Sequence, residues 1–352
     1  MDITLGVDSH KDSHTIYAVN AVGRPLDQVT VANDSDGYES AYQWASQQAT
    51  ARRWGIENCG HFGRGLAQYL LGQGETVVEV SPHLTGRKRN RSRKAEKSDP
   101  NDALAIARIV LQEDDPLPAI QPEDETTKVK LLVEQRDNLV GERTRLLNQL
   151  HGHLHEIDPH YKENLGQLDQ AKVLKRCKAY TLRGADAVSQ IRITIIRQLA
   201  TLILQLNTQI KALEKLLTPL VLILAPALLT IQGIKEITAA QLIACVGNIH
   251  TVPAASTLAH YAGIAPIKSG SAGNYYYRVN PKGNRRLNAV FHRIAKTQAR
   301  CNPLAKAYLQ KKKGEGKPHK QAFRCLKRRM VDIVYAVWKS GQPYAPPIPK
   351  FA

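Results

Sequence analysis

Cysteine is scarce in this chain, and the few cysteines it has are scattered. No two of them form a Cys-x-x-Cys pair, and their number is odd. This pattern excludes a disulfide framework and a zinc site built from thiolates. We therefore expect reduced thiols and a cytoplasmic protein. The cysteines are Cys59, Cys177, Cys245, Cys301 and Cys325.

The chain also lacks the hydrophobic signals that direct a protein to a membrane. Its first residues, MDITLGVDSHKD, have no basic segment followed by an apolar one, so they do not form a signal peptide. The most apolar run, residues 219–229, is too short to span a bilayer and contains Pro226. We expect no membrane partner.

Acidic residues are fewer than basic residues in this chain. Lys and Arg total 49 against 31 Asp and Glu, which gives a net charge of +18 and a pI near 9.7. Such a balance favours a polyanionic partner, most often nucleic acid, although a basic housekeeping protein is the plainer alternative. The hydrophobic fraction of 43% supplies a core, and 352 residues suggest about two domains of roughly 150 residues each.

The first hundred residues alternate between the strand and helix periods. Three strands come first, and then helices and strands alternate, which predicts a mixed sheet covered by helices. The expected strands span residues 3–8, 14–23, 25–33, 54–58 and 75–80, and the expected helices span residues 35–49, 63–71 and 98–114. Ser35 or Asp36 is expected to cap the first of these helices.

Residues 87–97, RKRNRSRKAEK, carry seven basic residues and one acid. The segment has too few apolar residues for a core, so we expect a mobile loop. It is either a solvated face or a phosphate-binding arm. The candidate nucleic-acid-binding residues here are Arg87, Lys88, Arg89, Arg91, Arg93 and Lys94.

Residues 116–125 contain three prolines and are expected to end the first domain. Beyond them, apolar residues from Ile195 to Leu217 recur every three or four positions, which predicts a helix about thirty residues long. Its apolar stripe would pair with a helix of the same chain or of a second copy, and both remain open. Pro219 and Pro226 are expected to end the helix.

The last third of the chain is strongly basic and mainly helical. Residues 228–247 read as a helix, a turn containing glycine and a second helix, an arrangement similar to a helix-hairpin-helix element. Between Lys282 and Arg329 there are sixteen Lys or Arg residues and one acid, Glu315. This distribution favours a nucleic-acid-binding surface.

Four acids stand at positions that suit metal chemistry. Asp8 ends the first buried strand, Glu57 lies in a later strand, and Asp99 and Asp102 stand three apart at the start of a helix. Asp99 alone would read as a helix cap and Glu57 as an ion-paired carboxylate. Their joint order is typical of RNase H-like folds. Converging carboxylates need cations, and an oxygen-only set selects magnesium or manganese.

These motifs carry a family resemblance. GVDSHK, IEN and SDPNDA, followed by GIAP, SGSAG and GNRRL, resemble the DEDD-type transposases of the IS110 insertion-sequence family, which includes bridge-RNA-guided recombinases and related DNA invertases. The resemblance implies an α/β RuvC-like catalytic domain (residues 1–115), a linker with a helical coiled-coil arm (116–225) and a mainly helical transposase domain (226–345). It implies that Asp8, Glu57, Asp99 and Asp102 bind the metal.

The resemblance also implies a serine nucleophile in the last domain. Ungapped counting from Gly263 places Ser271 at that position, and Ser269 is the alternative if the loop is shifted. Small neighbours would let the backbone approach DNA closely. Four basic residues follow and could hold phosphate oxygens through their charged donors. They are Arg278, Lys282, Arg285 and Arg286.

The family resemblance implies a DNA transposase or recombinase. The serine would form a covalent phosphoserine link, exchange strands between donor and target DNA, and require Mg²⁺ (or Mn²⁺) but no nucleotide cofactor. A noncoding guide RNA and a homodimer or homotetramer are implied likewise, as is a bacterial protein that associates with the nucleoid during the reaction. Two rivals stay open: a metal-dependent Holliday-junction-type nuclease that uses water, and a nucleic-acid-binding protein without catalysis.

Overall fold

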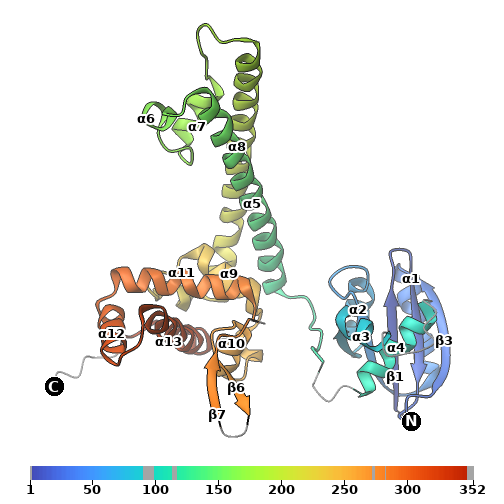
Figure 1. The fold of residues 1–352 in the computed structure, drawn as a ribbon. Coiled ribbons are helices and arrows are strands. Elements are labelled where there is room, and N and C mark those ends of the chain that lie inside the picture. Colours follow the sequence, from blue (N-terminus) through green and yellow to red (C-terminus); the bar gives the residue numbers. More distant parts are fainter. Residues whose placement is uncertain (1, 90–98, 113–116, 272–273, 282, 347–352) are drawn as a thin grey trace. The chain divides into compact units, whose positions relative to one another are not determined.

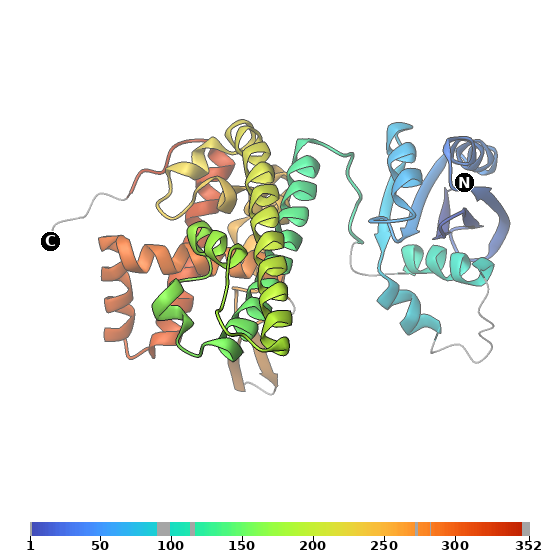
Figure 2. The same cartoon turned by 90° about the horizontal axis from the view of Figure 1, so that it is seen from above.

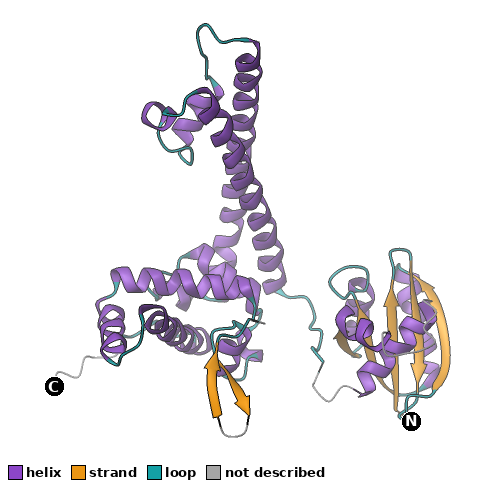
Figure 3. Cartoon of the chain, in the orientation of Figure 1, coloured by secondary structure: helices purple, strands orange, loops and turns teal. Residues whose placement is uncertain are grey.

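The computed structural model describes residues 2–89, 99–112, 117–271, 274–281 and 283–346. The chain forms two compact units, Met1–Glu123 and Asp124–Ala352 (Figure 1). The first unit is a sheet covered by helices, and the second consists mainly of helices (Figure 3). The finer division of the chain into three domains stays a prediction.

The first unit is built on a five-stranded mixed sheet in the order β3-β2-β1-β4-β5. β1, β2 and β3 pair antiparallel, whereas β4 and β5 continue from β1 in parallel. The predicted mixed sheet is therefore confirmed. Its strands are β1 (Asp2–Ser9), β2 (Ser13–Val19), β3 (Pro25–Ala32), β4 (Ala51–Glu57) and β5 (Thr76–Val80).

Helices cover both faces of this sheet, which is why the central strand β1 is buried almost throughout. α1 (Ser35–Gln48) and α2 (Arg64–Gly72) pack on one face against Leu5, Ile16 and Trp54. α4 (Asp99–Gln112) packs on the other face (Figure 2). Burial of apolar side chains between the sheet and its covering helices is the main source of the stability of this unit.

Two local details differ from the sequence-based expectation. The cap of α1 is Asp34, whose carboxylate accepts from the Gly37 N–H at 2.8 Å, rather than Ser35 or Asp36. The basic segment expected to be a loop begins as helix α3 (Pro82–Arg89). The remainder of that segment, residues 90–97, lies outside the described residues.

Two long helices, α5 (Glu125–Ile157) and α8 (Ala187–Leu224), pack along each other in the second unit. The Arg136–Glu214 ion pair joins the start of α5 to the end of α8, and an ion pair between Glu156 and Arg192 joins the opposite ends. The helices are therefore antiparallel. Their shared core includes Leu146, Leu150, Leu154, Ile196, Leu199 and Ile203.

The prediction that Pro219 ends the long helix was wrong, because α8 continues to Leu224. Proline removes one backbone hydrogen bond from a helix interior, but Leu217 and Val221 on either side of it are fully buried. Their packing keeps the helix intact. The predicted stripe was right in part: Leu199, Ile210 and Leu217 are buried, whereas Leu202 is exposed.

By length and composition alone α8 would be able to cross a membrane, a test that core helices of globular proteins also pass. Among the described helices only α8 meets it. The face formed by Ile196, Leu199 and Ile203 is buried against α5 and α7 in this unit.

The long helix pair carries two short helices at its far end and a helical base at the other (Figure 1). The far end holds α6 (Tyr161–Leu165) and α7 (Ala171–Lys178), where Tyr161 and Cys177 are buried. The base comprises η1 (Pro226–Thr230), α9 (Glu236–Val246), η2 (Ile249–Thr251), α10 (Ala255–Tyr261), β6 (Ile267–Ser271), β7 (Asn274–Arg278), α11 (Arg285–Cys301), α12 (Pro303–Gly314) and α13 (His319–Ser340).

The expected helix-hairpin-helix element forms only in part. Its first half is the single 3₁₀ turn η1, and its second half is α9. Gly233 lies between them at φ 91°, a left-handed conformation that favours glycine. Phe291 and Ile294 of α11 pack with Leu326 and Val331 of α13 in the core of the base.

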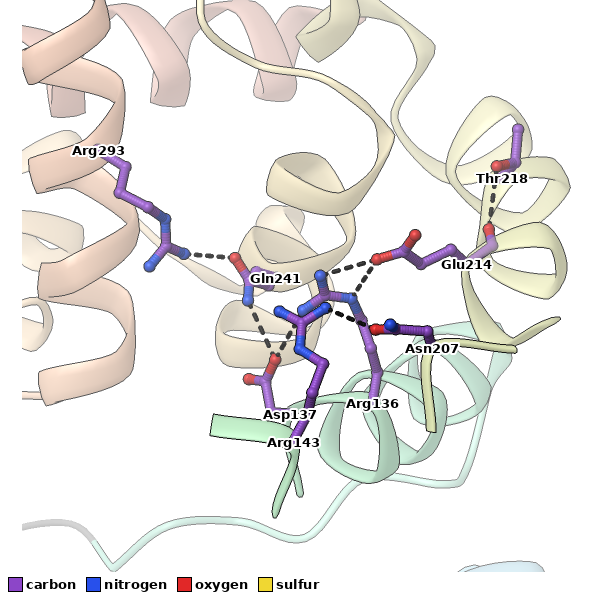
Figure 4. A network of polar contacts seen from close by, with 8 residues as sticks. All are labelled: Arg136, Asp137, Arg143, Asn207, Glu214, Thr218, Gln241 and Arg293. Carbon is purple, nitrogen blue, oxygen red and sulfur yellow. Dashed lines mark hydrogen bonds and ion pairs between the residues drawn. The ribbon is translucent and has the colours of Figure 1, made fainter. Parts of the chain in front are cut away.

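A polar network fastens the helix pair to this base (Figure 4). Arg136 on α5 donates to Glu214 on α8 at 2.8 Å. The neighbouring Asp137 accepts from Gln241 on α9 at 3.3 Å, and Gln241 in turn accepts from Arg293 on α11. The network therefore crosses four helices.

Replacing Arg136 with Met should lower the free energy of unfolding by about 1–2 kcal/mol, because partly buried charge-assisted hydrogen bonds are lost. Arg136 is only 17% exposed. Arg145→Met is the matched control, because Arg145 pairs with Glu142 on the exposed side of α5. It should cost less than about 0.5 kcal/mol. Urea unfolding checks both, and equal effects would contradict the role of the network.

A buried histidine makes the first unit sensitive to acid. The side chain of His14 on β2 is fully buried and lies beside the Tyr38 ring. Burial lowers the pKa of His14. Below a pH of about 6.5 the unfolded chain binds a proton that the folded chain rejects, so stability falls as the pH drops.

The melting temperature should therefore decrease between pH 7 and pH 5, and decrease less steeply in His14→Phe. The exposed His83→Phe variant is the control and should keep the slope of the parent protein. Thermal unfolding at several pH values checks this. Identical slopes for His14→Phe and the parent protein would show that His14 does not contribute.

Candidate metal centre and serine hairpin

Asp8 lies at the carboxyl end of β1, on the face of the sheet that α4 covers. Its side chain is largely buried, at 11% exposure, and its Oδ2 lies 3.2 Å from Nε2 of His10. Gly6 is two residues earlier, and therefore on the same face of the strand. A Cβ atom at Gly6 would come within 2.2 Å of the backbone of Ala103 and Ala107, so α4 packs directly on this strand.

Glu57 occupies the equivalent place on the neighbouring strand. β1 and β4 are parallel, with Gly6 opposite Gly55, so Asp8 and Glu57 each follow a glycine by two residues on one face. Oε1 of Glu57 lies 3.5 Å from the hydroxyl of Thr85 on α3. The two carboxylates therefore share one end of the sheet.

The direction of α4 brings its first turn to the same end. Arg108, near the end of α4, donates to the carbonyl of Gly23 at 3.2 Å. Gly23 lies in the turn after β2, at the end of the sheet where β1 begins. The amino end of α4, with Asp99 and Asp102, therefore lies where β1 ends.

Asp102 is placed toward β4. It precedes Ile106 by one helical turn and Val110 by two, and both of these side chains lie over Gly55. The structure thus brings Asp8, Glu57 and Asp102 to one end of one face. The side chain of Asp99, the first residue of α4, lies outside the described residues.

The chemistry of this donor set fits a hard divalent cation. Carboxylate oxygens are the ligands that magnesium and manganese prefer, and the amino end of α4 adds a partial positive charge near the acids. Among the side chains that the structure describes, no three of His, Cys, Asp or Glu are arranged to hold a metal. The assignment of the four acids as ligands stays a prediction.

The two candidate serines belong to a β-hairpin of the second unit. Ser269 lies in β6 opposite Tyr276 of β7, and Ser271 ends β6 opposite Asn274. The side chain of Ser271 and residues 272–273 lie outside the description. Register alone does not decide between the serines, so both stay candidates.

The base of the hairpin is fixed by two motifs that are far apart in the sequence. Gly263 of GIAP contacts Gly283, which begins GNRRL, and a Cβ atom at Gly283 would clash with the backbone of Gly263 at 2.2 Å. Asn288 donates to the carbonyl of Ala262 at 2.8 Å, and Lys327 on α13 donates to Asn288 at 2.7 Å. The distal motifs therefore position the strand that carries the serines.

The predicted nucleic-acid-binding residues lie in both units. Arg278 ends β7 and is exposed. Arg285 and Arg286 begin α11, and Arg286 lies 3.7 Å from Glu134 on α5. The backbone of Arg87, Lys88 and Arg89 forms the end of α3, and their side chains lie outside the description. Arg91, Arg93, Lys94 and Lys282 lie outside it entirely.

Sequence reasoning missed residues that support the predicted site. Thr85 contacts Glu57 and also donates to the carbonyl of Pro82 at 2.9 Å. Lys327 supports Asn288 from a helix almost forty residues later in the sequence. Contacts of this range leave no local signal in one sequence.

Comparison with known proteins finds transposases and related proteins of insertion elements. The DEDD-type IS110 transposase model matches residues 5–159, and the model described as "Transposase IS116/IS110/IS902 family" matches residues 225–310. The chain is 26% identical to an uncharacterized 44.8 kDa protein of insertion element IS116 from Streptomyces clavuligerus, over 99% of this chain and 97% of that protein. It is 24% identical to the pilin gene-inverting protein of Moraxella bovis, over 97% of each.

The chain belongs to the IS110 family of transposases. It is thus an enzyme of DNA transposition or recombination in general terms. The mixed sheet of the first unit fits an RNase H-like fold. The solved structure of Thermus thermophilus RuvC with a Holliday junction covers 34% of this chain, at 10% identity and a TM-score of 0.27.

Gly6→Ala should lower the free energy of unfolding by about 1–3 kcal/mol, because the added methyl group would press on the backbone of α4. Gly60→Ala is the control, since no heavy atom lies within 4 Å of a Cβ atom at that position. Urea unfolding measures both. If the two variants are equally stable, α4 does not depend on Gly6.

Proposed function

We propose that this protein is a DNA transposase that exchanges strands through a covalent phosphoserine intermediate. The observation that carries the proposal is the shared placement of Asp8, Glu57 and Asp102 at one end of one sheet face. Its second support is the hairpin with Ser269 and Ser271, which lies within the matched transposase segment. The first feature suits phosphoryl transfer and the second supplies a nucleophile.

We propose that Asp8, Glu57, Asp99 and Asp102 hold Mg²⁺, with Mn²⁺ as a substitute. The bound cation would supply positive charge where negative charge develops on the reacting phosphate. The neighbouring residues would position these carboxylates. The packing of α4 on Gly6 and Gly55 keeps the carboxylates in place, and His10 and Thr85 orient Asp8 and Glu57.

The serine oxygen would form a bond to phosphorus while the bond from phosphorus to the 3′ oxygen breaks. The serine loses one proton and the departing 3′ oxygen gains one, so no proton is consumed overall. The phosphoserine link retains the energy of the phosphodiester, and no nucleotide cofactor is required. In the rejoining step, a freed 3′-hydroxyl would attack another phosphoserine, forming a new phosphodiester between donor and target DNA. The bond from phosphorus to the serine oxygen breaks, and the serine regains its proton.

We further propose a noncoding guide RNA and a homo-oligomer as partners, acting at the chromosome in the bacterial cytoplasm. The net charge of +18 suits simultaneous binding of RNA and DNA. Leu202, Leu216 and Ile223 of α8 are exposed apolar residues on the helix that pairs with α5. A second copy that covers them would bury this surface.

The protein is mixed with magnesium, a labelled DNA duplex and the RNA transcribed from the DNA that flanks its own gene. This mixture should yield a covalent protein–DNA band. The double variant Ser269→Ala, Ser271→Ala should yield none, because both hydroxyls are removed. Ser256→Ala, at an exposed position on α10, is the matched control and should retain the band. Asp102→Asn should weaken cleavage by about 100-fold or more.

Cleavage without a covalent band in the double serine variant would favour a nuclease that uses water. DNA binding without cleavage by the parent protein would favour a non-catalytic binding protein. Undiminished cleavage by Asp102→Asn would show that Asp102 holds no catalytic metal. Each of these outcomes would overturn the proposal as stated.

A further inference from the structure

A groove of about 1020 Å³ lies in the base of the second unit, beside the hairpin that carries the serines. Its walls come from the GIAP loop, the end of β7, α12 and α13. Six basic residues of its lining were not among the candidate nucleic-acid-binding residues. The basic residues from α12, α13 and their connection are Lys312, Lys317, Arg324, Lys327, Arg328 and Arg329.

The lining of this groove is strongly positive. The acid in the lining is Asp332, and it is paired with Arg328. Glu315 lies next to Lys312 and Lys317 and accepts from them at 2.9 and 2.8 Å. Arg324 and Arg329 are exposed, and none of the ion pairs recorded within the described residues involves them. Such a concentration of like charge favours an extended anion.

Burial increases the cost of this charge. Lys327 is partly buried, and burial together with the nearby Arg324 lowers the pKa of its ammonium group. Its contact within the described residues is a neutral amide, that of Asn288. A phosphate in the groove would offset the repulsion among these cations.

Aromatic side chains accompany the cations. Tyr277 on β7 is 71% exposed, and Tyr308 on α12 lies 5.5 Å from the Lys312 ammonium group. Ile264 and Pro266 add an apolar surface. A positive groove with exposed aromatic rings is the arrangement that binds single strands, because unpaired bases stack on the rings while cations follow the phosphates. The bases of a duplex are already stacked and do not reach such rings.

The groove continues into the serine hairpin. Tyr277 and Arg278 line the groove, and Arg278 pairs with Ile267 on β6. Ser269 is two residues beyond Ile267 and Ser271 is four, which is about 7 and 13 Å along a strand. A strand held in the groove would therefore extend over the serines within a few nucleotides.

We infer that this groove binds single-stranded polynucleotide, DNA or RNA, and guides it to the serine hairpin. The inference about guidance rests on the proposed function, whereas binding does not. The groove would hold the strand that is displaced during exchange, or an unpaired segment of the guide RNA. Both offer phosphates and unpaired bases, and they differ in the 2′-hydroxyl.

The test uses the full chain with EDTA and labelled oligonucleotides of about 12 nucleotides, read by fluorescence anisotropy. The probes are single-stranded DNA, single-stranded RNA of the same sequence, and the DNA duplex. Arg324→Gln with Arg329→Gln should weaken single-strand binding about tenfold. The slope of log affinity against log salt should fall by about 1.4, because about 0.7 is lost for each phosphate contact.

Two further variants make the test specific. Arg300→Gln with Lys306→Gln removes the same charge from exposed positions outside the groove lining, and should weaken binding less than about twofold. Tyr277→Leu should weaken single-strand binding about fivefold without changing the salt slope, because it removes stacking but no charge.

If the groove variants lose more affinity for single-stranded DNA, the ligand is the displaced strand. If they lose more affinity for single-stranded RNA, the ligand is the guide RNA. Both results support the inference. Equal behaviour of the groove and control variants, or duplex binding as tight and as sensitive as single-strand binding, would overturn it. Because binding is measured without metal or cleavage, failure of the phosphoserine assay would leave this result unaffected.

Discussion

The close packing of one helix on two glycines determines the candidate metal centre. α4 lies on Gly6 and Gly55, and any side chain at these positions would push it away from the sheet. This contact fixes how far the first turn of the helix stands from the carboxyl ends of β1 and β4. Acids from three segments that are distant in the sequence can therefore gather at one end of the sheet, although carboxylates repel one another.

In the second unit, a glycine contact and hydrogen bonds hold the serine hairpin in position. Its serine hairpin has only two strands, and such a hairpin is marginally stable by itself. The contact between Gly263 and Gly283, together with Asn288 and Lys327, ties the loop before the hairpin to α11 and α13. A nucleophile on a short hairpin thus acquires a defined position from the helices behind it.

Much of the first unit could be predicted from the sequence, because its strands and helices have clear periods and turn signals. The expected strands at residues 3–8 and 75–80 agree with β1 and β5 to within a residue or two. The length of α8 could not be predicted, since buried packing around Pro219 outweighs the local preference of proline. The four acids were proposed from their order along the chain, whereas Thr85 and Lys327 act through tertiary contacts that no local pattern reveals. The coiled-coil arm and the roles of the acids and serines stay predictions.

The antiparallel pair of α5 and α8 leaves the base and returns to it. Val129 and Val133 near the start of α5, and Leu217 and Val221 near the end of α8, belong to the same hydrophobic core. The rest of the helix pair, with α6 and α7, is therefore attached to the base through this one core. Adding or deleting matched turns in both helices would change the length of the helix pair without changing its packing in the base. The length of this pair can therefore vary during evolution independently of the base.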